Sequence, residues 1–386
     1  MLVAPKVRGF ICTTAHPEGC RENVKRQIDY IKSQGVMDGP KNILIIGAST
    51  GYGLASRITA AFGLRAATIG IMYEKQAQGT RTATPGWYKT RAFEEFAAEE
   101  GLYAKSINGD AFSIQVKEEA VELIRKDLGK IDMVIYSLAA PRRTMADGTV
   151  YQSVLKTTDQ DFTNKSLDLR NNTIKEATIT PAEPGEIEAT IKVMGGEDWY
   201  DWIRTLSDQG VLSENAVTAA YSYIGPKLTY PVYYNGTIGM AKKHLSHTAE
   251  HLNRDFSAIG LKAYISVNKA LVTQASSAIP VVPLYFAILY RVMKEKGLHE
   301  GCIEQIRRLF YDKKLCSDPV LDSRNQIRLD DYEMQKDVQE EVMAAWDLVT
   351  TENVACLADL DGYWDDFYHM FGFRFESVDY DKDIDI

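Results

Sequence analysis

From about residue 40 onward, the chain alternates short apolar runs with segments whose apolar residues have helical spacing. The run "NILIIGA" (42–48) is continuously apolar, which is typical of a strand buried on both faces of a sheet. The segment that follows it, 54–63, has helical spacing. The alternation continues with strands expected at 66–74, 102–109 and 131–140 and helices expected at 87–101 and 113–129. This order predicts an α/β fold with a doubly wound parallel sheet of the Rossmann type.

The second half of the chain is less regular, and its pattern predicts insertions into that fold. The segment "TIKEATITPAEPGE" (173–186) indicates a small antiparallel excursion, and residues 284–297 are helical and apolar on nearly all sides, so we expect them to be buried or to line a pocket. Two helices broken at Gly195-Gly196 are expected within 186–206, and strands at 216–225 and 261–273. We expect a single large domain over residues 1–386, with an N-terminal extension (1–40) and an insertion at about 145–215.

Composition narrows the class of protein. The 386 residues are 45% apolar and 25% charged, as in an ordinary globular protein, and the net charge of −9 argues against a nucleic-acid partner. The five cysteines are scattered without a C-x-x-C pair, which is typical of reduced thiols in a cytoplasmic protein. The first residues lack the apolar run of a signal peptide. The longest apolar stretch (277–290) is too short to span a bilayer, so we expect no stable membrane insertion.

A glycine-rich turn follows the first buried strand. In "IIGASTGYGLASRI", Gly47, Gly51 and Gly53 come directly after the strand and at the start of a helix. Such a turn lets the backbone approach a pyrophosphate, and the helix N terminus supplies N–H groups and a positive dipole. Ser49 and Thr50 could add hydroxyl donors. The pattern favours dinucleotide binding, and the alternative is a glycine-rich turn without a ligand.

Three further positions follow the next strands of the expected sheet. Glu74, at the end of the second strand, would accept hydrogen bonds from the adenosine ribose and repel a 2′-phosphate, which favours NADH over NADPH. The alternative is a solvated glutamate, and the nearby basic residues at 75 and 81 could weaken the preference. Asp110 follows the third strand, where a side chain can reach the adenine. Leu138 and Ala139 follow the fourth, where a cofactor could lie close.

A tyrosine and a lysine nine positions apart form the main catalytic candidate, in "YYNGTIGMAKK" (233–243). Nine steps along one helix would place Tyr233 and Lys242 on opposite faces, but Thr237 is a good N-cap, so we expect the helix to begin there and Tyr233 to lie on the preceding turn. An ammonium lowers the phenol pKa from its usual value of about 10, and such a pair can hydrogen-bond a carbonyl and stabilise an enolate. The alternative is an interfacial tyrosine and a surface lysine, and Tyr234 and Lys243 are adjacent competitors.

Several motifs in fixed order resemble the trans-2-enoyl-CoA reductase family, which includes the FabV-type enoyl-[acyl-carrier-protein] reductases. They are "GASTGYG" (47–53), "KVMGGEDW" (192–199), "YSYIG" (221–225), Y-x8-K (233–242), "SVNKALVT" (266–273) and "KEKGLHEGCIEQI" (294–306). The resemblance implies a monomeric, enlarged relative of the short-chain dehydrogenases with insertions around its substrate site. It also implies NADH-dependent reduction of the trans-2 double bond of an enoyl-CoA or enoyl-acyl-carrier-protein thioester, in fatty acid synthesis or in fermentation.

The resemblance also implies roles for individual residues. Tyr233 would be the proton donor, Lys242 would hold the cofactor, and Tyr223 would contact the substrate near its thioester carbonyl. The cofactor would lie along Gly47, Ala48, Ser49, Thr50, Gly51, Tyr52, Tyr73, Glu74, Asp110, Ala111, Leu138, Ala139, Leu271, Val272 and Thr273. Which of the two tyrosines contacts the enolate stays open, and so does the choice between coenzyme A and a carrier protein.

Other signals have structural alternatives. His244, His247 and His251 fall on one helical side and could bind zinc, but no cysteine is near and the resembled family uses no metal, so we favour a partly solvated helix face and expect no metal. Arg142 and Arg143 either meet a phosphate of coenzyme A or face water. The segment 279–293 is either a wall for an acyl chain or a core helix. Trp199 and Trp202 are interpreted as a buried i, i+3 pair.

Two rival functions remain. The first is a carbonyl reductase that uses the same tyrosine and lysine on a ketone. The second is a non-catalytic NADH-binding protein, against which the presence of both members of the pair argues.

Overall fold

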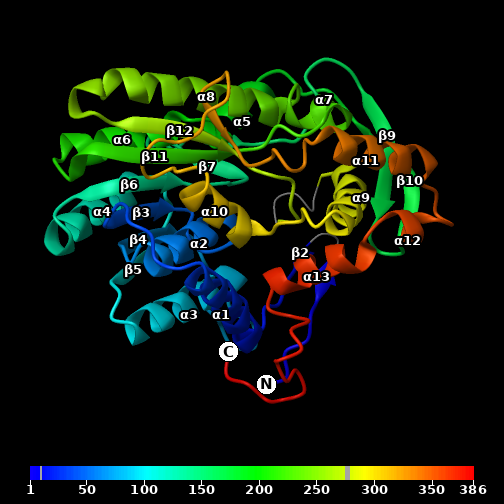
Figure 1. Cartoon of the computed structure of the whole chain (residues 1–386), viewed down its shortest axis with the longest axis horizontal. Coiled ribbons are helices and arrows are strands. Elements are labelled where there is room, and N and C mark those ends of the chain that lie inside the picture. The colour runs from blue at the N-terminus through cyan, green and yellow to red at the C-terminus, as the bar shows by residue number, and fades with distance from the viewer. Residues whose placement is uncertain (9–10, 274–278) are drawn as a thin grey trace.

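A seven-stranded parallel sheet forms the centre of the molecule (Figure 1). The computed structural model describes residues 1–8, 11–273 and 279–386. The strands lie in the order β13-β12-β11-β6-β3-β4-β5, and every neighbouring pair is parallel. Their bounds are β3 Asn42–Ile46, β4 Ala67–Met72, β5 Ala104–Asn108, β6 Ile131–Tyr136, β11 Leu212–Ser222, β12 Lys262–Val267 and β13 Gln326–Arg328. This confirms the doubly wound sheet expected from the alternating pattern.

Helices cover both faces of the sheet, as its strands require when they are apolar on both sides. Residues 43–46 of β3 are fully buried between the two layers. One face is covered by α1 (Pro17–Ser33), α2 (Gly51–Ile58), α3 (Pro85–Glu99) and α10 (Cys302–Tyr311). The other is covered by α4 (Ile114–Asp127), α6 (Glu197–Asp208) and α8 (Thr237–Asp255). Figure 1 shows α8 and α6 above the sheet and α1, α2 and α3 below it.

Beyond one end of the sheet lies a third group of elements (Figure 1). Its centre is α9 (Val282–Glu295), which packs against α11 (Lys336–Leu348), α13 (Leu360–Met370) and the hairpin of β9 (Phe162–Asp168) and β10 (Thr173–Ile179). The antiparallel β9–β10 pair confirms the excursion expected from "TIKEATITPAEPGE". The break at Gly195-Gly196 is also confirmed, because α5 (Glu186–Met194) ends there and α6 begins at Glu197.

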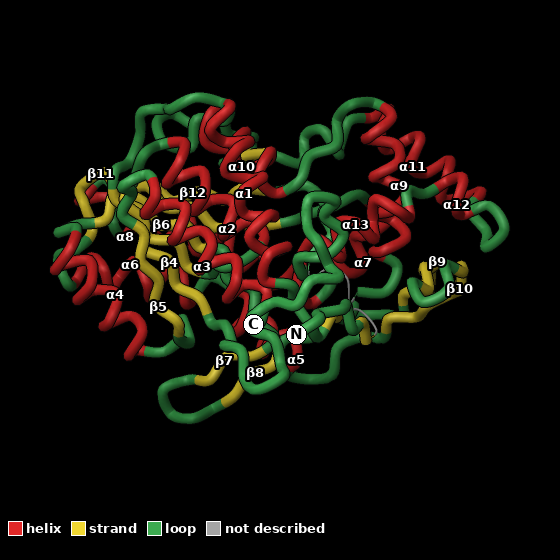
Figure 2. Tube along the Cα trace, turned by 90° about the horizontal axis from the view of Figure 1, so that it is seen from below, coloured by secondary structure: helices red, strands yellow, loops and turns green. Residues whose placement is uncertain are grey.

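The remaining elements are short. A second hairpin joins β7 (Arg142–Thr144) to β8 (Val150–Gln152), and the first residues form β1 (Val7–Arg8) and β2 (Ile11–Cys12). A one-turn helix, α7 (Tyr230–Tyr233), precedes α8, and α12 (Val354–Leu357) precedes α13. The two chain ends lie side by side (Figure 2), where the Met1 ammonium donates a hydrogen bond to the Ile384 carbonyl at 2.6 Å.

The strand expected over 261–273 is shorter than its sequence suggests, because β12 ends at Val267. Beyond it, the N–H of Asn268 donates to the Ser222 carbonyl, and three further backbone N–H groups donate to side chains. The N–H of Lys269 donates to Gln305, that of Ala270 to Glu333, and that of Val272 to the Tyr290 hydroxyl, at 2.7 to 3.0 Å. The loop 268–273 is therefore held in place by α10, α9 and the segment after β13.

Candidate active site

Apart from Lys242 on α8, the predicted cofactor residues lie in segments that follow strands of the central sheet, at the edge where the carboxyl ends of the strands meet. Gly47 follows β3, Glu74 follows β4, Asp110 follows β5, Leu138 follows β6 and Leu271 follows β12. Tyr223 follows β11 in the same way. Ligands of doubly wound sheets bind outside this edge, at the point where the strand order reverses. Here that point lies between β3 and β6.

The glycine-rich turn sits at that reversal point. Gly47 has a φ of +83°, and a side chain on it would collide with the Ser137 carbonyl oxygen just past β6. A side chain on Gly53 would collide with the carbonyl oxygen of Gly47. The Thr50 side chain makes no capping hydrogen bond at the N terminus of α2, which begins at Gly51. The backbone amides there are left for a ligand, as in a pyrophosphate-binding turn.

Glu74 is fixed beside this turn. Its N–H donates to the Asn108 side-chain oxygen at 2.8 Å, and the Ser49 hydroxyl donates to its carboxylate at 2.6 Å. Ser49 therefore orients the carboxylate, a role that the sequence did not indicate. Tyr73 beside it is 76% exposed, so only its backbone lies at the edge.

Two further loops at this edge are held from within the protein. The backbone N–H of Phe112 donates to the Asp110 carboxylate at 3.0 Å. Ala111 is buried and its carbonyl accepts a hydrogen bond from Trp202 at 3.1 Å. Leu138 is half-buried and Ala139 is exposed.

A cavity of about 230 Å³ is lined by residues of the glycine-rich turn and of the loop after β12. Thr50, Gly51, Leu271, Val272 and Thr273, all predicted to bind the cofactor, line it. Tyr52 joins the same two segments, because its hydroxyl donates to the Lys269 carbonyl at 2.9 Å.

Lys89 of α3 also lines this cavity, and the sequence did not indicate it. Its side chain is 4% exposed, and no hydrogen bond or ion pair is found for its ammonium among the described residues. Burial lowers the pKa of Lys89. An unpaired buried cation is costly, so its presence here points to an anionic ligand in the cavity.

The backbone bends between Tyr233 and Lys242 as expected. Tyr233 ends the one-turn helix α7 and α8 begins at Thr237, so no continuous helix joins the pair. The N-cap is Gly236 and not Thr237, whose hydroxyl instead donates to the Val154 carbonyl at 2.5 Å. Thr237 is used in tertiary packing, and this is why it does not cap the helix.

Tyr233 and Lys242 are both largely withdrawn from water. The Tyr233 ring is 7% exposed and meets the Tyr223 ring edge-on, with centroids 4.7 Å apart. The Lys242 ammonium donates to the Tyr221 carbonyl at 3.0 Å, and burial lowers the pKa of Lys242 to about 8. Burial and the Glu333 carboxylate raise the pKa of Tyr233, so the expected lowering by an ammonium is not found. Removal from water, with the Glu333 carboxylate, sets the direction of this pKa shift.

The adjacent competitors point elsewhere. Tyr234 stacks on Tyr230, with ring centroids 4.8 Å apart, and the Lys243 ammonium lies 5.0 Å from the Tyr234 ring. Lys243 is exposed. Neither residue therefore joins the buried Tyr223–Tyr233 pair.

The structure tests one of the two alternatives stated for Arg142 and Arg143, that these side chains face water. Arg143 is 4% exposed and its guanidinium contacts the Glu197 carboxylate at 2.9 Å and the Lys192 carbonyl at 3.0 Å. It therefore does not face water, which corrects that alternative for this residue. Arg142 is exposed on β7.

The histidine face and the tryptophan pair differ in burial. His244 is half-buried and accepts the Gly196 N–H at 3.0 Å, and His247 and His251 are exposed. No group of three or more His, Cys, Asp or Glu able to hold a metal occurs among the residues that the structure describes. Trp199 and Trp202 are fully buried, as expected.

The fold and the glycine-rich turn at its carboxyl edge define the class of Rossmann-type dinucleotide-binding proteins. Comparison with known families is more specific. A model described as the catalytic region of trans-2-enoyl-CoA reductase matches residues 81–315, and the NAD(P)H binding domain of trans-2-enoyl-CoA reductase matches residues 2–79. The chain belongs to the trans-2-enoyl-CoA reductase family.

Similar proteins span the whole chain. An enoyl-[acyl-carrier-protein] reductase [NADH] of Flavobacterium johnsoniae is 56% identical, covering 99% of this chain and 97% of its own length. A trans-2-enoyl-CoA reductase [NADH] of Ruminiclostridium cellulolyticum is 54% identical, covering 100% and 98%. The crystal structure of a trans-2-enoyl-CoA reductase of Treponema denticola in complex with NAD is 49% identical, has a TM-score of 0.95 and covers 100% of this chain and 98% of its own.

A third model, described as the enoyl reductase FAD binding domain, matches residues 321–384. All of these residues are described, and they lack a glycine-rich turn between a strand and a helix. The strand β13 has three residues, and α11 begins only at Lys336. The glycines of this segment are Gly362, whose N–H donates to Asp359, and Gly372, which packs against α1. These residues do not fit a second dinucleotide of the kind bound at such a turn.

Proposed function

We propose that this enzyme reduces the trans-2 double bond of enoyl thioesters with NADH, giving the saturated acyl thioester. The observation that carries the proposal is the position of Tyr233. It lies in the same apolar cluster as Leu271 and Val272, and these two residues line the cavity at the glycine-rich turn. A phenol in the apolar cluster that also reaches the cofactor cavity is an arrangement that reduction of a conjugated carbonyl compound can use.

Bound NADH supplies a hydride to C3 of the substrate. Negative charge then builds on the thioester oxygen, and the Tyr233 hydroxyl donates a hydrogen bond to that oxygen. Because the pKa of Tyr233 is raised, the phenol keeps its proton at neutral pH. C2 is protonated last, with the tyrosine as the direct or relayed source. Lys242 holds the cofactor through its ammonium.

Residues at the carboxyl edge support the choice of cofactor. The Glu74 carboxylate, oriented by Ser49, accepts hydrogen bonds from the adenosine ribose and repels the 2′-phosphate of NADPH. The Lys89 ammonium would pair with the cofactor diphosphate, together with the amides at the start of α2. Asp110, Ala111, Leu138 and Ala139 would border the rest of the dinucleotide.

The apolar helix α9 is proposed as part of the wall of the acyl site. Its side chains belong to the apolar cluster that contains Tyr233. It also supports the site, since Tyr285 contacts Glu333 and Tyr290 holds the N–H of Val272. Both expectations for residues 279–293, wall and core helix, are compatible with this position.

The enzyme is proposed to act as a single cytoplasmic domain and as a monomer. Its five cysteines are all free. No helix among the described residues is long and apolar enough to cross a membrane. The substrate is proposed to be carried by coenzyme A or by acyl-carrier protein, since similar proteins are named for each.

The decisive experiment follows NADH absorbance with purified enzyme and enoyl-CoA thioesters of two chain lengths, then with an enoyl thioester of acyl-carrier protein. We expect NADH oxidation with at least one of them and none with a simple ketone. Turnover of the ketone alone would establish the rival carbonyl reductase. Tight NADH binding with no turnover of any thioester would reject the proposed function.

A further inference from the structure

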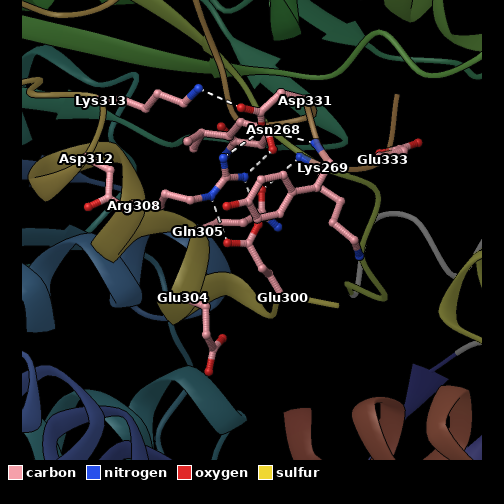
Figure 3. A network of polar contacts seen from close by, with 12 residues as sticks. Asn268, Lys269, Glu300, Glu304, Gln305, Arg308, Asp312, Lys313, Asp331 and Glu333 are labelled. Atoms are coloured by element: carbon pink, nitrogen blue, oxygen red, sulfur yellow. Dashed lines mark hydrogen bonds and ion pairs between the residues drawn. The ribbon is translucent and has the colours of Figure 1, made fainter. Parts of the chain in front are cut away.

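A buried carboxylate lies behind the tyrosine pair. Glu333, five residues after the end of β13, is 0% exposed. Figure 3 shows it on the same chain segment as Asp331, with its carboxylate directed away from the network of Arg308, Glu300 and Asp331. No cation within ion-pair distance of Glu333 is found in the described part of the chain. Its partners are hydrogen-bond donors instead.

Three donors converge on this carboxylate. The Tyr223 hydroxyl lies 3.0 Å and the Tyr285 hydroxyl 2.7 Å from its Oε1, and the Ala270 N–H lies 2.7 Å from its Oε2. Gln339 donates to the Tyr285 oxygen at 3.2 Å, which fixes the direction of the Tyr285 bond. All three groups donate to it, as they do to a carboxylate in its ionised form, which can only accept.

Tyr223 and Tyr233 differ in whether their hydroxyl proton is free to be donated to a substrate. A phenol has one proton, and that of Tyr223 is already given to Glu333. Tyr223 can therefore offer the substrate only its ring and its oxygen lone pairs. The Tyr233 hydroxyl, in contrast, makes no hydrogen bond within the described residues, and its ring is oriented by edge-on contact with Tyr223.

We infer that Glu333 is a positioning residue for the reduction: it takes the Tyr223 proton, and so leaves Tyr233 as the phenol of the pair that can donate to the thioester oxygen. This inference rests on the proposed function. It assigns the enolate contact to Tyr233, and it gives Glu333 a second task, because the same carboxylate holds the N–H of Ala270 at the start of the cofactor loop.

The charge of Glu333 acts in the same direction as its hydrogen bonds. Burial raises the pKa of Tyr223, Tyr285 and Tyr233, and the Glu333 carboxylate raises it further, because a buried carboxylate disfavours a second negative charge nearby. Tyr233 thus stays a proton donor over the neutral range. Burial raises the pKa of Glu333 itself, and the charge of Lys269 opposes that rise.

The test is a double-mutant cycle between Glu333→Gln and Tyr223→Phe. The glutamine oxygen can still accept the Ala270 N–H while its amide group donates to the phenols, so the cofactor loop keeps its bond but the Tyr223 bond reverses. We expect kcat to fall at least roughly tenfold while KM for NADH stays within about twofold. The kcat of the double variant, which combines Glu333→Gln with Tyr223→Phe, should be at most about threefold lower than the kcat of the less active single variant.

Two controls keep this test decisive. Asp330→Asn removes another fully buried carboxylate of the same segment, one that pairs with Arg328 and contacts neither tyrosine, and we expect its kcat to stay within about threefold of the parent. Glu333→Asp keeps the charge and should retain more kcat than Glu333→Gln. If the glutamine variant does not fold, the aspartate variant takes its place in the cycle.

Independent, multiplying effects of Glu333→Gln and Tyr223→Phe would overturn the inference, and so would a Glu333→Gln enzyme with parental kcat. Either result would leave the proposed function intact as long as the parent enzyme reduces an enoyl thioester. Failure of the parent to do so is a separate outcome, and it would reject the function first.

Discussion

The dinucleotide side and the tyrosine side of this site are built in different ways. On the dinucleotide side, β3, the turn from Gly47 and α2 follow one another in the chain, and the ligand-binding geometry comes from consecutive residues. On the tyrosine side, Tyr223, Tyr233, Ala270 and Glu333 come from separate segments up to 110 residues apart. A local turn tolerates changes elsewhere in the fold, whereas an assembled cluster depends on every segment that supplies a partner.

The two sides are joined through one loop. Tyr52 of the first turn of α2 holds the Lys269 carbonyl, and Glu333 holds the N–H of Ala270 one residue later. The loop after β12 is thus tied to both sides through a single peptide group, the one that joins Lys269 to Ala270. The comparison therefore predicts that tyrosine-side variants change kcat and dinucleotide-side variants change KM for the cofactor.

The largest effect is expected on the tyrosine side. Tyr233→Phe removes the hydrogen bond to the developing enolate and should lower kcat by roughly a hundredfold, about 3 kcal/mol of barrier, with little change in KM for NADH. Steady-state NADH oxidation with an enoyl-CoA measures both constants. Tyr234→Phe is the matched control, because its ring stacks on Tyr230 outside the pair. Equal losses in both variants would remove Tyr233 from the mechanism.

A smaller effect is expected on the dinucleotide side. Lys89→Met removes a buried cation without a described partner, so KM for NADH should rise about tenfold while kcat changes little. Thermal unfolding without cofactor should show equal or higher stability, because the cost of burying the charge disappears. Lys117→Met is the contrasting control. Its ammonium pairs with Asp198 at 2.6 Å, so its loss should destabilise the fold.

If Lys89 instead recognises a 2′-phosphate, the Lys89→Met variant will lose activity with NADPH and keep that with NADH. A variant with unchanged KM for both cofactors would remove Lys89 from the cofactor site.

Cofactor choice gives the third prediction. Glu74→Gln keeps the hydrogen bond from Ser49 but removes the charge that repels a 2′-phosphate. The ratio of kcat/KM for NADPH to that for NADH should therefore rise, by about tenfold. Glu118→Gln, at an exposed site on α4, should leave the ratio unchanged. An unchanged ratio in Glu74→Gln would mean that selectivity comes from another residue.

The same contrast explains what the sequence could predict. The alternating runs, the order of the elements and the glycine-rich turn depend on neighbouring residues, so periodicity was enough to predict the sheet, the break at Gly195-Gly196 and the bend before α8. Glu333 lies in "DDYEMQ", where nothing local marks a buried carboxylate. Its partners are defined only once β11, α9 and the loop after β12 are placed in space.

Predictions from neighbouring residues were also wrong where tertiary contacts determine the hydrogen bonding. The apolar stretch after β12 was expected to continue as a strand, but its N–H groups are bound by Gln305, Glu333 and Tyr290 instead. Thr237 was expected to cap α8, but its hydroxyl bonds to Val154. Lys89 could not be identified from its spacing on α3, because its importance comes from burial without a partner.

The smallest expected effect concerns the pH dependence of stability on the tyrosine side. Lys269 is 2% exposed, and burial lowers its pKa from 10.5 to about 8. Between these two pH values the unfolded chain binds the proton and the folded chain does not. The folded state is therefore favoured as the pH rises through this window, and below it Lys269 contributes a constant penalty. We compare urea unfolding at about pH 7.5 and about pH 9.5. The free energy of unfolding of the parent should increase between these pH values relative to that of a Lys269→Met variant. The raised pKa values of the buried tyrosines lower the stability of the folded state only above about pH 10, outside this interval. A parent that loses stability relative to the variant between the two pH values would therefore show that Lys269 stays charged in the folded enzyme.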